Sequence, residues 1–282
     1  MRKVCFYHAG CPDGFGAAWS VWRAWGDSAE YRPIGHDEPL NVASYEGAEI
    51  VFVDIFTRTQ TLRELGDVAA HVLVLDHHVT SRDRFHAEAE LENDLRDGGH
   101  RVHFDLSHSG AVLAWQHFHG GETPVLLDYV EDQDLWNWKL PHSEEVNAAI
   151  GSHPRSFESW DSLAARPLEA LVAEGEPLVR QGKIDVERAI KKAHPITVAG
   201  RRVDAVNSTA QRSAIGHALS EKATYGEPWG CVYRVNGGRV DVTLYSIGEL
   251  DVSAVAVSLG GGGHRNAAGF SVRLKAWLAD FL

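Results

Sequence analysis

The sequence predicts an α/β fold: an N-terminal domain built on a mostly parallel sheet with helices on both faces, followed by a smaller C-terminal α+β domain. In the first half, short apolar runs alternate with helical patterns, as they do in βαβ units. The runs at residues 51–53 and 72–75 are apolar throughout, which is typical of strands buried on both faces. In the last third, Asn236-Gly237-Gly238 separates two β-branched runs and predicts a hairpin.

The same patterns predict the elements of the N-terminal domain. Residues 3–8 begin a strand at once and lack the pattern of a signal peptide. In open parallel sheets, ligands bind beyond the carboxyl ends of the strands, so these ends are where we look for a site. We expect strands at residues 3–8, 49–54 and 71–76, and helices at 16–26, 59–69, 109–119 and 124–135.

A long, charged helical pattern at residues 168–193 separates the two domains, and we interpret it as a connector. The predicted organisation is therefore an N-terminal domain at 1–167, a helical connector at 168–194 and a C-terminal domain at 195–282. In the C-terminal domain we expect helices at 213–223 and 252–259 and strands at 230–235, 239–245 and 269–274.

Composition limits the classes of function. The chain has 282 residues and a net charge of −12, and such a field repels a long polyanion, so we expect no long duplex DNA as a partner. No apolar run approaches the ~20 residues that a membrane span needs, and we expect no membrane partner. The three cysteines, Cys5, Cys11 and Cys231, are odd in number and scattered, which fits a reducing compartment and predicts a cytoplasmic protein.

Acidic residues and histidines gather at four places near the ends of predicted elements. Because parallel strands end at one edge of a sheet, these side chains can converge although they are far apart in sequence. Carboxylates and imidazoles together suit Mn²⁺, Mg²⁺ or Zn²⁺, and a shared carboxylate can set two ions ~3.5–4 Å apart for in-line attack on phosphorus. The four groups are His8 with Cys11 and Asp13, then Asp54, then Asp76-His77-His78, and finally Asp132 with Asp134.

Asp76-His77-His78 is the most informative of these groups. It ends an apolar strand, where two imidazoles and a carboxylate need paired partners or a metal. A solitary His or Asp at a strand end is more often a helix cap or a solvated residue, so the signal lies in the combination. The sequence therefore predicts a metal site around this tripeptide.

A glycine-rich loop at residues 260–269 is the second motif. Glycines let backbone N–H groups approach an anion closely, and neighbouring charged side chains can add donors to a phosphate oxygen. Alone, such a loop is a turn as often as a phosphate cradle. The expected substrate-binding residues are Gly261, Gly262, Gly263, His264 and Arg265.

Together the motifs resemble those of the DHH/DHHA1 phosphoesterases, which include oligoribonucleases, cyclic-dinucleotide phosphodiesterases and RecJ-type exonucleases. The resemblance covers nearly the whole chain. Residues 8–18 are similar to the first motif, 53–54 to the second and Asp132 to the fourth. Asp76-His77-His78 looks like the name-giving motif, and the glycine run with His264 is similar to the GGGH signature of the DHHA1 domain.

The resemblance implies a two-metal site, with Mn²⁺ favoured. Asp54 would bridge the two ions, and a bridging hydroxide would be the nucleophile. His78 would contact the phosphate as a catalytic residue, and Asp76 would orient a neighbouring histidine. The implied metal ligands are His8 on one side and Asp13, His77 and Asp132 on the other, with Cys11 at the place of a further carboxylate.

Two positions leave alternatives open. A thiolate at Cys11 is softer than the usual carboxylate and favours Zn²⁺ or Fe²⁺ over Mn²⁺, with Mg²⁺ and Co²⁺ as further candidates, unless Cys11 packs as a small apolar residue. Asp128, Asp132 and Asp134 compete as the fourth-motif ligand. We favour Asp132, because Tyr129 and Val130 precede it as an apolar approach and Leu135 and Trp136 follow.

We therefore expect hydrolysis of a phosphodiester by metal-activated water in a cleft between the domains. A small phosphorylated substrate, a short oligonucleotide or a (cyclic) dinucleotide, is favoured over a long strand, because no basic groove is evident. The alternatives are a polyphosphatase, a pyrophosphatase or a pAp-type phosphatase and, from another class, a catalytically weak nucleotide-binding or sensor protein. The sequence leaves a homodimer open.

Overall fold

The computed structural model describes residues 1–282, which divide into two compact units, Met1–Val179 and Arg180–Leu282. We call them unit 1 and unit 2 and describe each by itself. The division falls inside helix α9 (Leu168–Ile190), the segment that the sequence predicted as a connector. No helix combines the length and the apolar character that crossing a membrane would require.

Unit 1 is built on a five-stranded sheet in which every neighbouring pair is parallel. The strand order is β2-β1-β3-β4-β5, so the three strands that carry the predicted site residues lie side by side in the middle of the sheet. The predicted α/β class and the parallel sheet are confirmed. The strands are β1 (Lys3–His8), β2 (Glu30–Ile34), β3 (Glu49–Val53), β4 (His71–Asp76) and β5 (Arg101–Phe104).

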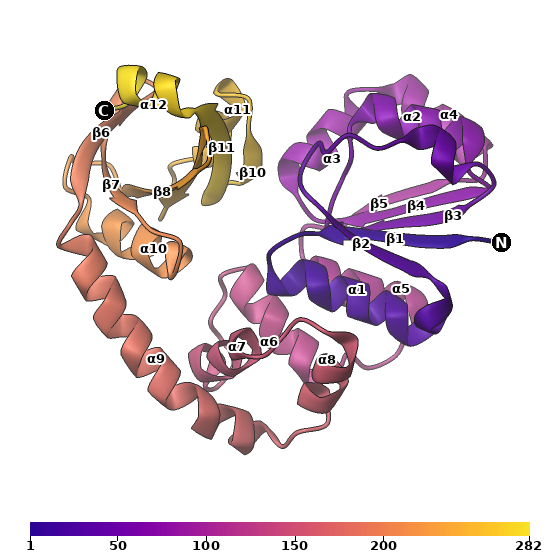
Figure 1. The fold of residues 1–282 in the computed structure, drawn as a ribbon, viewed down its shortest axis with the longest axis horizontal. Helices are drawn as coiled ribbons and strands as arrows, with labels where there is room; N and C mark the ends of the chain where they lie inside the picture. Colours follow the sequence, from indigo (N-terminus) through magenta and orange to yellow (C-terminus); the bar gives the residue numbers. More distant parts are fainter. The chain divides into compact units, whose positions relative to one another are not determined.

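Helices cover both faces of this sheet, as predicted (Figure 1). Successive strand residues alternate between two hydrophobic cores: Cys5 belongs to one core, and Val4 and Phe6 belong to the other. The first core packs against α1 (Pro12–Trp25), α5 (Gly110–Phe118), α6 (Val125–Asp134), α7 (Ser143–Ser152) and α8 (Phe157–Ala164). The second packs against α2 (Thr59–Val68), α3 (Val79–His86) and α4 (Ala89–Asp97).

Several elements of unit 1 were not expected from the sequence. Strand β2 contains Pro33 and is largely accessible, which an edge strand tolerates because one side of its ladder needs no N–H donor. Strand β5 has four residues and forms the opposite edge. Helix α1 begins at Pro12, four residues before the predicted start, because the Cys11 side chain caps it and proline is favoured in the first turn.

Unit 2 is an α+β domain on a six-stranded sheet of order β10-β11-β9-β8-β7-β6, in which only β7 and β8 pair in parallel. The hairpin predicted at Asn236-Gly237-Gly238 joins β8 and β9. The strands are β6 (His194–Val198), β7 (Arg201–Asn207), β8 (Trp229–Asn236), β9 (Arg239–Ser246), β10 (Gly262–His264) and β11 (Ala267–Arg273). The helices are α10 (Arg212–Lys222), α11 (Val252–Ser258) and α12 (Leu274–Asp280).

Candidate metal centre

The predicted site residues of unit 1 meet at the carboxyl edge of its sheet. His8 ends β1, Asp54 directly follows β3, and Asp76 ends β4. Asp54 adopts a left-handed backbone conformation, with φ of 57°, and its N–H donates to the carbonyl of Leu75 at 2.9 Å. This conformation, uncommon for a residue other than glycine, is held by the neighbouring strand and is a frequent feature of functional sites.

Three carboxylates surround one ring nitrogen of His77. Its Nε2 lies 2.9 Å from Asp54 Oδ1 and 3.6 Å from an oxygen of both Asp13 and Asp134. The side chains of Asp13, Asp54 and His77 are almost completely buried. Such a concentration of negative charge in a low-dielectric interior is unfavourable unless a cation compensates it.

A second group of donors lies on the other side of the Asp54 carboxylate. Its Oδ2 is 3.4 Å from His8 Nδ1 and 3.5 Å from Cys11 Sγ. His8 Nδ1 and Cys11 Sγ are themselves 3.4 Å apart. Asp54 thus faces an oxygen-rich group with one of its oxygens and a nitrogen- and sulfur-containing group with the other.

Asp76 holds both histidines of the tripeptide. Its Oδ1 lies 2.7 Å from His78 Nδ1 and accepts the backbone N–H of His77 at 2.8 Å. Asp76 is fully buried, and its Oδ2 has no hydrogen-bond partner. A carboxylate in contact with one ring nitrogen fixes the orientation of an imidazole and makes its other nitrogen more basic.

Two glycines, Gly14 and Gly110, let the backbone come close to these side chains. The N–H groups of Gly110 and Ala111, at the start of α5, donate to the Asp13 carboxylate at 2.7 and 3.0 Å. A Cβ on Gly110 would lie 2.3 Å from the Cβ of Asp54, and one on Gly14 would lie 2.2 Å from the carbonyl oxygen of His8.

The charges of the group are strongly coupled. Burial raises the pKa of Asp13 well above its usual range, and the carboxylates of Asp54 and Asp134 add to this effect. Burial acts in the same direction on Asp54, but hydrogen bonds with His77 and His8 hold the pKa of Asp54 well below its usual value. Burial opposes protonation of His77, whereas the contact with Asp54 and the other carboxylates raises its pKa well above the usual value.

These donors fit divalent cations. Asp13, Asp54 and His77 offer one set of ligand atoms within 4.8 Å of one another, and His8, Cys11 and Asp54 offer another. The Asp134 Oδ2 atom is buried without a hydrogen-bond partner, which is the state expected of an oxygen that a metal would satisfy. Carboxylate and imidazole ligands are those of Mn²⁺, Mg²⁺ and Zn²⁺ sites.

The structure places the three aspartates of α6 differently with respect to His77. Asp132, which we favoured, accepts the backbone N–H groups of Lys139 and Leu140 at 2.9 and 3.2 Å and so closes the turn after α6. Asp134 is the carboxylate near His77. Asp128 makes no contact with the group and faces other acidic residues. The two candidates are only two residues apart, so apolar neighbours could not tell which one turns toward the sheet edge.

His36 belongs to the group and was missed. It follows edge strand β2, and its ring centroid lies 4.7 Å from that of His8 and 5.4 Å from that of His78. Its side chain is exposed, and its ring nitrogens lie within 4.8 Å of ligand atoms on both neighbours. His36 was not predicted as a site residue because strand β2, which precedes it, was not predicted either.

The glycine-rich loop of unit 2 forms the end of α11 and the short strand β10. The N–H groups of Gly260 and Gly261 donate to Val257 and Ala256 carbonyls in the last turn of α11, so Gly261 is not the anion donor that we expected. A Cβ on Gly261 would lie 2.0 Å from the Gly269 carbonyl oxygen, which explains the glycine by packing. The remaining expected donors are Gly262, Gly263, His264 and Arg265.

Arg265 already has an acidic partner. Its guanidinium donates at 2.8 Å to both the carbonyl and the carboxylate of Glu249. Both side chains are accessible, so the ion pair is weak and can exchange for an anionic ligand.

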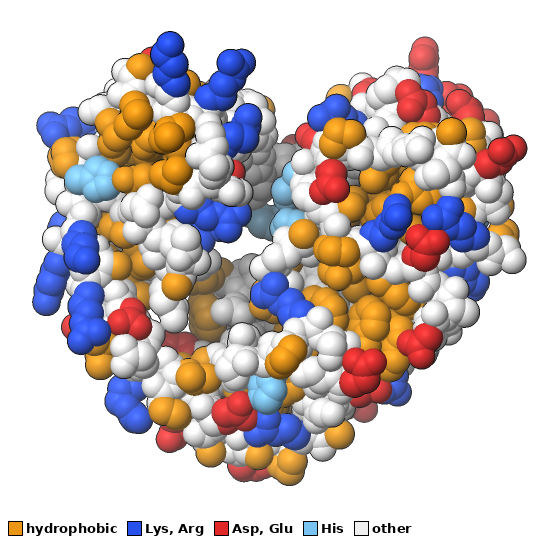
Figure 2. Space-filling model, in the orientation of Figure 1, with side chains coloured by type: hydrophobic (Ala, Val, Ile, Leu, Met, Phe, Trp, Pro, Cys, Tyr) orange, Lys and Arg blue, Asp and Glu red, His pale blue; other side chains and the backbone are white.

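Charge is distributed unevenly along the chain. Residues 1–179 contain 13 Lys and Arg and 30 Asp and Glu, whereas residues 180–282 contain 14 and 9. The net charges are therefore −17 and +5, and basic side chains predominate on the surface of unit 2 in Figure 2. The overall value of −12 concealed a cationic domain, so our argument from net charge against a basic binding surface does not hold for unit 2.

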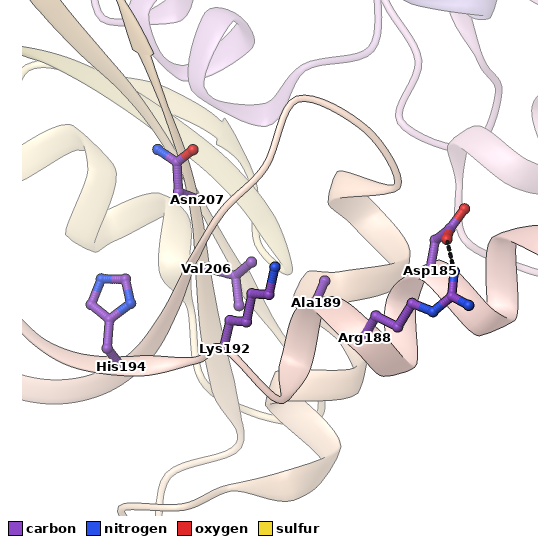
Figure 3. A pocket seen from close by; sticks show the side chains of 7 residues that line it. All are labelled: Asp185, Arg188, Ala189, Lys192, His194, Val206 and Asn207. Carbon is purple, nitrogen blue, oxygen red and sulfur yellow. Dashed lines mark hydrogen bonds and ion pairs between the residues drawn. The ribbon is translucent and has the colours of Figure 1, made fainter.

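Part of this cationic surface lines a cavity of about 320 Å³ in unit 2 (Figure 3). The end of α9 contributes Asp185, Arg188 and Ala189, with Lys192 in the turn that follows. His194 of β6 and Val206 and Asn207 of β7 complete the wall. Arg188 is paired with Asp185 at 3.4 Å. None of the expected glycine-loop residues lies here.

Comparisons with known proteins bear on both parts of the chain. Residues 196–282 match the family model of the DHHA1 domain, which confirms the recognition of that domain. An uncharacterized protein of Acanthamoeba polyphaga mimivirus is 27% identical over 292 residues, which cover 95% of this chain and 67% of that protein.

Two solved structures are similar at low identity. A pGpG-specific phosphodiesterase from Vibrio cholerae is 12% identical, with a TM-score of 0.44 and coverage of 99% of this chain and 95% of that chain. An exopolyphosphatase-related protein from Bacteroides fragilis is 9% identical, with a TM-score of 0.43 and coverage of 95% and 86%. Both likenesses are weak, so only the DHHA1 match assigns a family, and it assigns it to residues 196–282.

Proposed function

We propose, on the premise that residues 196–282 are a DHHA1 domain, that this chain is a divalent-metal-dependent phosphoesterase that hydrolyses a phosphodiester of a short oligonucleotide or a (cyclic) dinucleotide. The observation that carries the proposal is the group in which the buried side chains of Asp13, Asp54 and His77 meet the partly exposed Asp134. Buried acids gathered around one imidazole serve no packing purpose, whereas they suit divalent ions.

The proposed ligands divide around Asp54. At one proposed metal position, Asp54 Oδ1 would bind together with Asp13, His77 and Asp134. At the other, Asp54 Oδ2 would bind together with His8 and Cys11. Bound divalent ions at such positions supply a water nucleophile of lowered pKa and neutralise charge on the phosphate. In this proposal, Asp134 takes the role that we expected of Asp132.

The chain's own groups contribute the remaining chemistry. Asp76 orients His78 and, although burial opposes this, its charge raises the pKa of His78 above the usual value. An imidazolium held in this way donates to a phosphate oxygen as negative charge develops there. The N–H groups of Gly110 and Ala111 hold Asp13, so the carboxylate needs no reorganisation during the reaction.

The cationic character of unit 2 supports a polyanionic substrate. Its net charge of +5 and the Arg265 guanidinium suit the non-reacting phosphates of a nucleotide chain. A substrate with one or two phosphodiesters fits a small number of such groups better than a long strand, which would run along the strongly acidic surface of unit 1.

A substrate panel with Mn²⁺ tests the proposal. We would measure hydrolysis of dinucleotides, cyclic dinucleotides, short RNA, pAp and polyphosphate by the full chain, and of its Asp54→Asn variant. Asp67→Asn, on the exposed side of α2, is the matched control. We expect the wild type and the control to cleave the nucleotide diesters and Asp54→Asn to show only background. If the wild type hydrolyses none of these with Mn²⁺, Mg²⁺, Co²⁺, Zn²⁺ or Fe²⁺, the enzyme proposal fails in favour of a nucleotide-binding protein.

A further inference from the structure

Three donor atoms at the His8 corner of the metal centre form a nearly equilateral triangle. His8 Nδ1, Cys11 Sγ and Asp54 Oδ2 are separated by 3.4, 3.5 and 3.4 Å. Each atom belongs to a different segment of the chain: the end of β1, the cap of α1 and the residue after β3. His8 and Cys11 are only three residues apart, so it is the fold that brings Asp54, 43 residues beyond Cys11, to complete the triangle.

These edges have the size of a tetrahedral metal site. With Zn–S of ~2.3 Å and Zn–N and Zn–O of ~2.0–2.2 Å, ligand atoms on a tetrahedron lie about 3.4–3.6 Å apart. An octahedral ion with bonds of ~2.0–2.1 Å, such as Mg²⁺, needs neighbouring ligands only about 2.9 Å apart. The donor set points the same way, because a thiolate and an imidazole select Zn²⁺ or Fe²⁺ over Mn²⁺ and Mg²⁺.

One contact of Cys11 favours a thiolate, although burial and the carboxylates of Asp54, Asp13 and Asp134 raise the pKa of its thiol well above the ordinary value. Its Sγ accepts the N–H of Gly14 at 3.2 Å as the cap of α1, a helix of 14 residues. A helix N-terminus stabilises negative charge on a capping sulfur. A packed apolar cysteine, the other reading of this position, would not need two polar ligand-type atoms within 3.5 Å of its sulfur.

His36 is positioned to supply a fourth ligand. Its ring centroid is 4.7 Å from that of His8. The N–H of Ala9 donates to the carbonyl of Ile34, the last residue of β2, and so continues the β1–β2 pairing one residue past the end of β1. Its side chain is exposed, and its ring nitrogens lie within 4.8 Å of ligand atoms on His8, a corner of the triangle, and on His78. The loop backbone is anchored next to it, where Asp37 accepts two hydrogen bonds from Arg84 at 3.0 and 3.1 Å.

We infer that His8, Cys11, Asp54 and His36 form a tetrahedral thiolate site for Zn²⁺ or Fe²⁺, whereas Asp13, Asp134 and His77 form a harder site for Mn²⁺ or Mg²⁺, so that the two positions of the centre take different metals. This inference rests on the proposed function. Asp54 links the two positions through its two oxygens. Zinc sites can expand to five ligands, which leaves the water of the proposed reaction room to bind.

Metal content and cobalt spectroscopy test the inference without reference to activity. In the wild type we expect two ions per chain, one Zn²⁺ or Fe²⁺ that resists exchange with excess Mn²⁺ and one that exchanges. After replacement of the tight ion by Co²⁺, a sulfur-to-cobalt charge-transfer band should appear in the near ultraviolet. Cys11→Asp should lose the band and bind Mn²⁺ at both positions. Cys231→Ser, a buried cysteine of unit 2, is the control that should keep the band.

His36→Ala separates the fourth ligand from the triangle. We expect its affinity for Zn²⁺, measured by competition with a chelator, to fall about 10- to 100-fold, with Mn²⁺ binding unchanged. His86→Ala, on an exposed part of α3, should behave as the wild type. Unchanged Zn²⁺ affinity in His36→Ala would remove His36 from the ligand set.

The whole inference is overturned if the Co²⁺ form of the wild type lacks the charge-transfer band, or if Cys11→Asp retains a Zn²⁺ ion that resists exchange. Either result leaves the proposed function standing when the wild type hydrolyses diesters with Mn²⁺ alone. Conversely, a chain that binds two different metals but hydrolyses nothing contradicts the proposed function and not this inference.

Discussion

Replacement of Gly110 by alanine is the sharpest test of how the backbone shapes the metal centre. The new Cβ would lie 2.3 Å from Asp54 Cβ and 2.8 Å from Asp54 Cα. Non-bonded carbons approach to about 3.5–4.0 Å, so the two segments must separate by more than about 1 Å. Asp54 cannot yield by rotating its side chain alone, because its Cα is one of the atoms met and its N–H is bonded to the Leu75 carbonyl at 2.9 Å.

Two measurable effects follow from this displacement. Overpacking of a buried position costs about 1–3 kcal/mol, or roughly 3–9 °C in the midpoint of thermal unfolding. The helix propensity of alanine offsets less than about 1 kcal/mol of it. Because the displacement alters the distance between Asp54 and His77, now 2.9 Å, we expect turnover to fall about 100-fold.

The assay is Mn²⁺-dependent hydrolysis of bis-p-nitrophenyl phosphate, together with thermal unfolding and metal content. Gly151→Ala in α7 is the matched control, because a Cβ there meets no atom within 4 Å. It should retain full activity and be as stable as the wild type or slightly more stable. If Gly110→Ala kept wild-type turnover and metal content, the close approach of α5 to Asp54 would not be what shapes the centre.

Three further predictions concern single side chains. Asp134→Asn should weaken metal binding about 10- to 100-fold, as measured by titration calorimetry. Asp132→Ala should bind the metals as the wild type does, but should lose about 1–2 kcal/mol of unfolding free energy because its two hydrogen bonds from backbone N–H groups are lost. The reverse pattern would identify Asp132 as the ligand. Burial and nearby acids raise the pKa of Asp128 to about 6, so the free energy of unfolding falls as the pH rises from about 4 through 6. In urea unfolding, Asp128→Asn should be as stable as the wild type near pH 4 and, allowing for solvent screening, more stable by about 1 kcal/mol at pH 8. Equal stability of the two proteins at pH 8 would contradict this prediction. Glu249→Ala, which releases the Arg265 guanidinium, should lower KM for a dinucleotide and leave kcat unchanged. Arg265→Ala should raise KM. Equal KM values in both variants would exclude Arg265 from substrate binding.

Much of the architecture was predictable because it depends on local patterns. Apolar runs at residues 51–53 and 72–75 predicted buried parallel strands, and the glycine-containing turn at 236–238 predicted a hairpin. The edge strands β2 and β5 were not predicted, because β2 contains a proline and β5 has only four residues. Edge strands bury little surface, so their sequences carry a weak pattern.

The sequence predicted that carboxylates and histidines would form a metal centre, but it did not predict which of them lie in it. The sequence by itself determined which residue types were available: Asp76-His77-His78 after an apolar strand, Asp54 after another, and His8 with Cys11 and Asp13 around the first. Which of them meet was decided only by the tertiary structure. Asp134 replaced Asp132 near His77, and His36 joined His8 and His78. The reason is physical: a strand end or helix turn fixes where a residue's backbone stands, but the direction of its side chain depends on packing against segments distant in sequence.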